Sequence, residues 1–109
     1  MRITTHEFVH DLVSAVPELR PLLDEHLADN YGELLPHVLF GDITRWVESA
    51  VEHGVDLNAA NQLLALLDSA YADHGDDVCN LITVSFLESL DPAVVNLLSA
   101  RLRAVAASL

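Results

Sequence analysis

Apolar residues recur every three or four positions along most of the chain, which is the spacing of one face of an α-helix. The first such stripe consists of Phe8, Val9, Leu12, Val13 and Val16. Thr4 followed by Glu7 matches a capping box, in which each residue satisfies a free backbone N–H at the start of a helix. A first helix is therefore predicted from about residue 5 to residue 15, and Pro17 ends it.

Proline, glycine and short polar residues divide the rest of the chain into further helices, because each favours one end of a helix. The second helix is predicted to start at Pro21 and to stop at Gly32, and the third to run from Pro36 to His53 with Gly54 as its stop. The fourth is predicted to be capped by Asn58 and to end at His74 and Gly75. The fifth is capped by Asp76 or Asp77 and ends near Leu90, and Asp91-Pro92 starts the last helix.

Residues 78–87 also suit a strand, because they are rich in β-branched side chains. Strict alternation fails there, however, since Leu81-Ile82 and Phe86-Leu87 are adjacent apolar pairs. A strand at this point would also lack a partner strand elsewhere in the chain. We therefore predict a helix.

Length and apolar content predict how these helices assemble. The chain has 109 residues, of which 51% are hydrophobic, enough for one domain with its own core. The prediction is an all-α, compact bundle of five to six helices over residues 1–109, with the fourth and fifth helices central, or one of them at a homodimer interface. The residues expected to be largely buried are Trp46, Leu66, Ile82, Phe86 and Leu98.

The charge balance narrows the classes of partner. Acidic residues number 17 and basic residues 5, all of them arginine, which gives a formal net charge of −12. A nucleic acid or an anionic membrane needs a basic surface, so neither is an expected partner. The balance favours a basic protein partner, or serves high solubility alone. No segment reaches the roughly 18 consecutive apolar residues of a membrane span, and the start of the chain is too acidic for a signal peptide, so the expected location is the cytoplasm.

Acidic residues form two rows at helical spacing. Glu25, Asp29 and Glu33 follow the second helix, and Glu48 and Glu52 lie on the third. Like charges four residues apart destabilise a helix by a few tenths of a kcal/mol per pair. Such local strain is expected more often at functional sites than elsewhere. These five residues are therefore the predicted partner-binding surface.

His6-Glu7-Phe8-Val9-His10 matches the zinc-peptidase pattern H-E-x-x-H. Three features oppose a zinc site. The chain has no room for strands before this helix, Val16 stands where a third histidine is wanted, and both histidines lie away from the apolar stripe. We expect no catalytic residue, no metal at His6 or His10 and no cofactor.

Two segments, residues 34–46 and 80–88, resemble stretches of small bacterial proteins of unknown function, some of which are immunity proteins of toxin systems. The resemblance implies a bacterial origin and a binding role, and it brings no active-site residues.

Together these features predict a protein-binding module and not an enzyme. Its most concrete form is an immunity-type inhibitor that docks a basic toxin through the acidic surface. One alternative is a homodimeric regulatory or scaffold protein. Another is a metal-dependent hydrolase that uses His6, Glu7 and His10.

Overall fold

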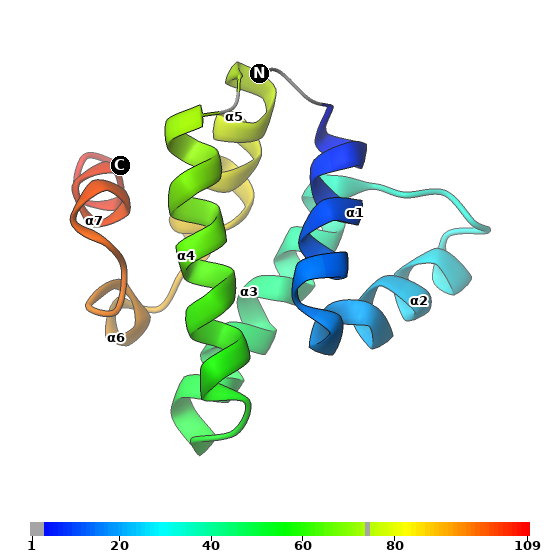
Figure 1. The fold of residues 1–109 in the computed structure, drawn as a ribbon, viewed down its shortest axis with the longest axis horizontal. Coiled ribbons are helices and arrows are strands. Elements are labelled where there is room, and N and C mark those ends of the chain that lie inside the picture. The colour runs from blue at the N-terminus through cyan, green and yellow to red at the C-terminus, as the bar shows by residue number, and fades with distance from the viewer. Residues whose placement is uncertain (1–3, 74) are drawn as a thin grey trace.

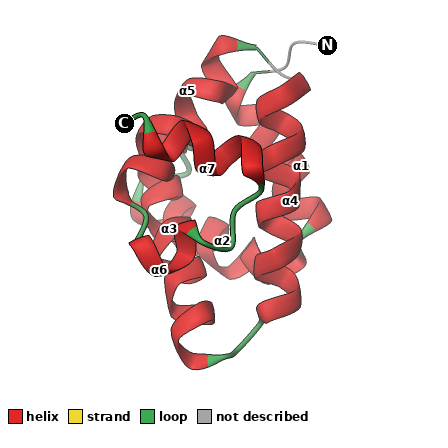
Figure 2. Ribbon diagram, turned by 90° about the vertical axis from the view of Figure 1, so that its left-hand side faces the viewer, coloured by secondary structure: helices red, strands yellow, loops and turns green. Residues whose placement is uncertain are grey.

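Helices are the only regular elements in the part of the chain that the computed structural model describes, residues 4–73 and 75–109 (Figure 2). They are α1 (Thr5–Ala15), η1 (Pro17–Leu19), α2 (Arg20–Asp29), α3 (Pro36–His53), α4 (Leu57–Asp73), α5 (Asp76–Ser85), η2 (Leu87–Ser89), α6 (Pro92–Val95) and α7 (Ala100–Ala107), where η denotes a short 3-10 helix. The all-α prediction is confirmed. The described residues contain seven α-helices, against the five to six predicted.

The ends of α1 and α3 lie where the sequence placed them. The Glu7 backbone N–H donates to Thr4 Oγ1 at 3.1 Å and the Thr4 N–H donates to Glu7 Oε1 at 3.2 Å, which completes the capping box. Helix α3 begins at Pro36 and ends before Gly54, which takes the left-handed conformation (φ 68°) that glycine adopts without strain.

Helix α2 stops three residues before Gly32, the predicted stop. Its last helical residue is Asp29, and Tyr31 takes a positive φ of 56° before Gly32 does the same at 83°. The Gly32 N–H then donates to the Leu27 carbonyl at 2.7 Å, a bond that closes the end of the helix. The left-handed position that usually belongs to glycine is therefore held by a tyrosine.

Two predicted helix ends were wrong, namely the start of α4 and the end of α5. Helix α4 begins at Leu57, so Asn58 lies inside its first turn and is not its cap. Asp56 precedes it with a φ of 56°, and its carbonyl accepts from Ala60 N at 2.9 Å. Helix α5 ends at Ser85 and not near residue 90, because the chain tightens into η2. The predicted end of α4 at His74 lies outside the described residues.

The predicted last helix is two helices. Asp91 caps α6 as expected, its Oδ1 accepting from Ala93 N at 2.8 Å, but α6 ends after four residues. Ser99 then caps α7 by accepting from Leu102 N at 3.3 Å. The break turns α7 back to pack beside α4 and η2.

Helix α4 stands across the middle of the molecule, with α1 and α2 on one side of it and α6 and α7 on the other (Figure 1). Behind it, α3 packs against α1, α2, α4, α5 and α6. One hydrophobic core takes side chains from α1 through α7, and no described helix is long and apolar enough to cross a membrane.

The buried core contains Ile82, Phe86 and Leu98, as predicted. Trp46 and Leu66 pack against this core and are mostly, but not fully, buried. Trp46 keeps some exposed surface because it lies at the edge of α3 that faces α2, where the two helices leave a groove.

Candidate binding site between helices α2 and α3

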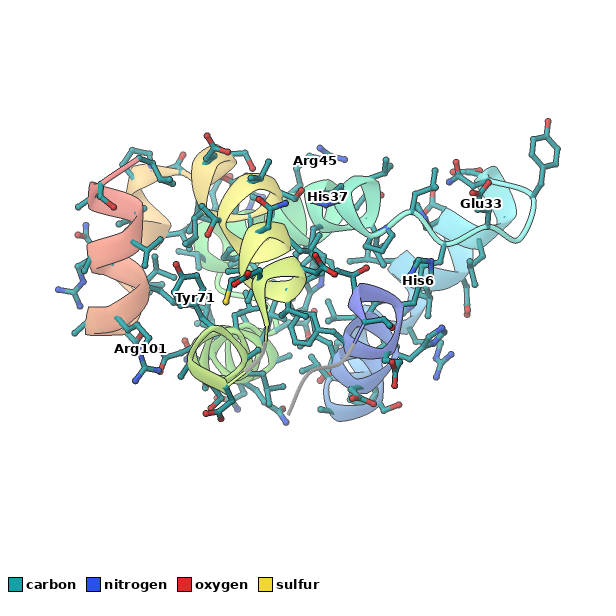
Figure 3. All side chains as sticks on the ribbon, turned by 90° about the horizontal axis from the view of Figure 1, so that it is seen from above. His6, Glu33, His37, Arg45, Tyr71 and Arg101 are labelled. Atoms are coloured by element: carbon teal, nitrogen blue, oxygen red, sulfur yellow. The ribbon has the colours of Figure 1, made fainter. Side chains whose placement is uncertain are left out.

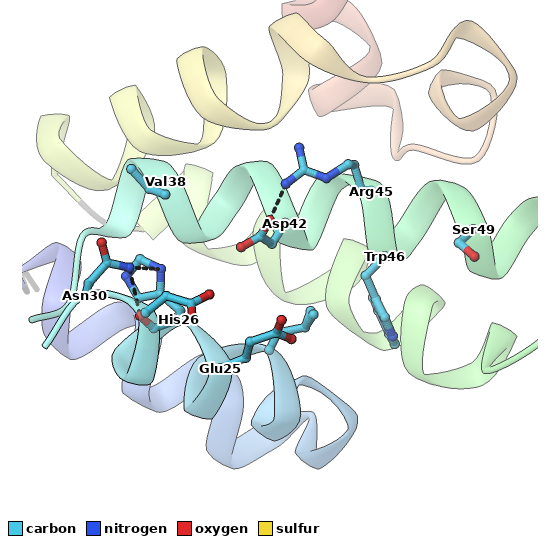
Figure 4. A pocket seen from close by; sticks show the side chains of 10 residues that line it. Glu25, His26, Asn30, Val38, Asp42, Arg45, Trp46 and Ser49 are labelled. Atoms are coloured by element: carbon cyan, nitrogen blue, oxygen red, sulfur yellow. Dashed lines mark hydrogen bonds and ion pairs between the residues drawn. The ribbon is translucent and has the colours of Figure 1, made fainter. Parts of the chain in front are cut away.

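A groove of about 460 Å³ separates α2 from α3 (Figure 4). Its walls combine apolar side chains with carboxylates, an arginine and an amide. The lining residues on α2 and at its end are Leu22, Glu25, His26, Asp29 and Asn30, and those on α3 are Val38, Asp42, Arg45, Trp46 and Ser49. Successive lining positions on each helix are one to four residues apart, so one face of each helix forms the groove.

Apolar contact area in this groove comes mainly from α3. Trp46, the only tryptophan in the chain, is half-buried with its ring at the groove, and Val38 is 55% exposed. A partly exposed indole offers a large rigid surface for a binding partner. The groove can therefore contribute hydrophobic as well as electrostatic binding energy.

The groove is net negative. Glu25 and Asp29 are exposed on successive turns of α2, and Asp42 faces them from α3. Asp42 pairs with Arg45, the one basic side chain of the lining. Within the described parts of the chain, the carboxylates of Glu25 and Asp29 form no ion pair or hydrogen bond, so both are free to meet a cation.

His26 ties the end of α2 to the start of α3. Its ring is 3% exposed, and its Nε2 accepts a hydrogen bond from the Leu35 backbone N–H at 2.9 Å. An accepting nitrogen carries no hydrogen, so the neutral ring carries its hydrogen on Nδ1. The Asn30 side-chain nitrogen donates to the His26 carbonyl at 2.8 Å and lies 3.4 Å from Nδ1. These bonds fix the loop that spans the groove at one end.

The five predicted binding residues fall into three places. Glu25 and Asp29 line the groove, as described. Glu48 and Glu52 line a second hollow of about 420 Å³ against Asp91, where Glu48 is half-buried because its Oε2 accepts from the Asp91 N–H at 2.7 Å. Glu33 is exposed in the α2–α3 loop and lines neither hollow (Figure 3).

Sequence reasoning missed the other lining residues of the groove, among them His26, Asn30, Asp42 and Trp46. Asp42 and Arg45 stand three residues apart, a spacing that allows an ion pair within one helix, and the only tryptophan was predicted to be largely buried. What the sequence does not contain is the contact between α2 and α3, which converts these separate features into one surface.

The histidines of the H-E-x-x-H match have no group of three ligating side chains around them in the described residues. His6, labelled in Figure 3, and His10 are exposed on α1, and Glu7 is engaged in the capping box. Throughout residues 4–73 and 75–109, no three histidine, cysteine, aspartate or glutamate side chains group closely enough to hold a metal ion.

The single cysteine lies outside the groove, between α4 and α5. Its Sγ donates to the Tyr71 carbonyl at 3.3 Å. Burial, and secondly the negative charge of Asp76, raise the pKa of the Cys79 thiol. At neutral pH the thiol is therefore protonated, which disfavours a nucleophilic role.

The fold and the groove define a small all-helical domain with an acidic groove that includes one aromatic side chain. Residues 9–107 match a family model described as a domain of unknown function (DUF7674), and the chain belongs to this family. Neither the curated proteins nor the solved structures contain a match. The resemblance to toxin-immunity proteins receives no support from these comparisons.

Proposed function

We propose that this protein is a binding module that docks a basic protein through the groove between α2 and α3. The observation that supports this role is the convergence of Glu25, Asp29 and Asp42 around the half-buried Trp46. Unpaired carboxylates accelerate the encounter with a cationic surface, and the indole adds contact area once the partner is seated.

The net charge of the chain supports the same partner class. With a formal charge of −12, the molecule attracts basic proteins at long range, and the groove then selects where they dock. In its most concrete form the module is a cytoplasmic immunity-type inhibitor that covers the basic face of a toxin.

The two alternatives find less support in the described residues. A homodimeric scaffold needs a continuous apolar face, whereas the exposed large apolar side chains lie on separate segments: Tyr31, Val38, Val55, Leu57, Val84, Leu97 and Leu109. A hydrolase that uses His6 and His10 needs a free general base, and Glu7 is committed to the helix cap. The proposed role is therefore binding without catalysis.

Charge reversal tests the proposal. The double variant Glu25→Lys/Asp29→Lys should fold normally, because both side chains are exposed and unpaired. Its association with a basic protein partner, measured by surface plasmon resonance at low salt, should slow by tenfold or more.

Glu33→Lys/Glu52→Lys is the matched control, since it changes the net charge equally but lies outside the groove. It should slow association much less. Equal slowing by both double variants would assign binding to the overall charge and remove the groove from the proposal. A basic partner that binds the groove variant as fast as the unaltered protein would contradict electrostatic docking.

A further inference from the structure

We propose that the groove binds an arginine side chain of the partner, and that the protein's own Arg45 competes with it for Asp42. This inference rests on the proposed function and specifies the chemistry of the partner at that same surface.

The groove already holds one guanidinium group. Arg45 reaches back along α3 to Asp42, three residues earlier, and both side chains line the groove (Figure 4). The pair is exposed, with 71% of the Arg45 side chain and 38% of the Asp42 side chain accessible to solvent. Exposed pairs of this kind are weak, so an incoming cation can displace Arg45.

Trp46 and the carboxylates of α2 favour arginine over lysine. A planar guanidinium stacks on an indole ring and binds carboxylates through two parallel N–H groups, which a lysine ammonium cannot do. Trp46 supplies the ring, and Glu25 and Asp29 supply carboxylates that are unpaired among the described residues. All three lie within the same groove.

The partner in the proposed function is a protein, so the arginine would reach the groove as part of a peptide chain. The groove volume of about 460 Å³ lies in the range typical of ligand sites. His26 belongs to the wall of the groove, where its Nε2 accepts from the Leu35 N–H and its Nδ1 lies 3.4 Å from the Asn30 side-chain nitrogen.

Binding can be measured without the natural partner. The probes are blocked tetra-arginine, tetra-lysine and tetra-citrulline peptides, the last of which has the arginine shape without the charge. The fluorescence of Trp46, the only tryptophan, reports occupation of the groove. Tetra-arginine should change it saturably and bind several-fold more tightly than tetra-lysine, and tetra-citrulline should leave it unchanged.

The competition by Arg45 makes a distinctive prediction for substitutions. Arg45→Gln should tighten tetra-arginine binding by about two- to fivefold, the factor that corresponds to one exposed ion pair. Adding Asp42→Asn should abolish that gain. Arg101→Gln is the matched control, because Arg101 also pairs with an aspartate, Asp68, but outside the groove. It changes the net charge equally and should change the affinity less.

The outcomes separate this inference from the proposed function. Equal effects of Arg45→Gln and Arg101→Gln would overturn the competition, and equal binding of tetra-lysine would overturn the arginine assignment. If the peptides leave Trp46 unchanged while Glu25→Lys/Asp29→Lys still slows a basic protein, the inference fails and the proposed function stands. If the peptides bind as expected but that double variant slows no basic protein, the proposed function fails alone.

Discussion

Tyr31 takes a backbone conformation that its side chain does not favour. Its φ of 56° lies in the left-handed region, yet the side chain is fully exposed and gains no burial in return. A non-glycine residue in that region costs about 1–2 kcal/mol. Gly54 holds the equivalent place at the end of α3 without this cost. Strain retained at an exposed aromatic next to the acidic groove suits a residue that contacts a partner.

Tyr31→Gly should therefore stabilise the protein by about 1 kcal/mol, because glycine adopts positive φ freely. The free energy of unfolding from urea titration measures the effect. Gly54→Ala is the converse control and should destabilise, since its φ of 68° is strained for alanine although space is open around it. A loss of stability in Tyr31→Gly would show that the tyrosine ring makes stabilising contacts.

At the scale of elements, one buried side chain anchors the junction between α5 and η2 in the core. Phe86 follows the last residue of α5 and is fully buried in the core. Phe86→Ala should cost about 3–5 kcal/mol, as large-to-small changes in packed cores do. Val84→Ala, two residues earlier and 46% exposed, should change stability by less than about 0.5 kcal/mol. Urea unfolding measures both changes. A similar loss of stability in the two variants would contradict a buried Phe86 beside an exposed Val84.

The sequence predicted those element ends that local chemistry determines. The capping box of Thr4 and Glu7 marks the start of α1, and Pro36 and Gly54 mark the two ends of α3. The start of α4 depends on the left-handed turn at Asp56, which no local residue type demands. The break before α7 had a signal in Ser99, a good helix cap, but the apolar stretch around it also suited one continuous helix.

The site was less predictable than the helices. Glu25 and Asp29 were identified from their spacing, because a row of like charges is visible within one helix. The opposite wall, with Asp42 and Trp46, required knowing that α3 crosses beside α2. That contact arises from packing of the whole chain, which periodicity along a single helix does not specify.

Across the whole molecule, charge repulsion opposes folding. The formal charge is −12, and the ion pairs with arginine within the described residues are Arg45–Asp42 and Arg101–Asp68. Raising the salt concentration from about 10 to 150 mM should screen the repulsion and raise the melting temperature by a few degrees. Calorimetry measures this shift, and Glu25→Lys/Asp29→Lys should show a smaller one. A melting temperature independent of salt would show that repulsion contributes little.

The bond from Cys79 to the Tyr71 carbonyl joins α5 to α4, and its consequence concerns the rate of local opening. A thiol that is partly covered and has a raised pKa reacts slowly while the two helices stay together. Modification by a thiol reagent should then proceed chiefly through brief separations of α5 from α4. The modification rate of this single thiol therefore measures how often α5 separates from α4. The thiol lies outside the groove where partners are proposed to dock.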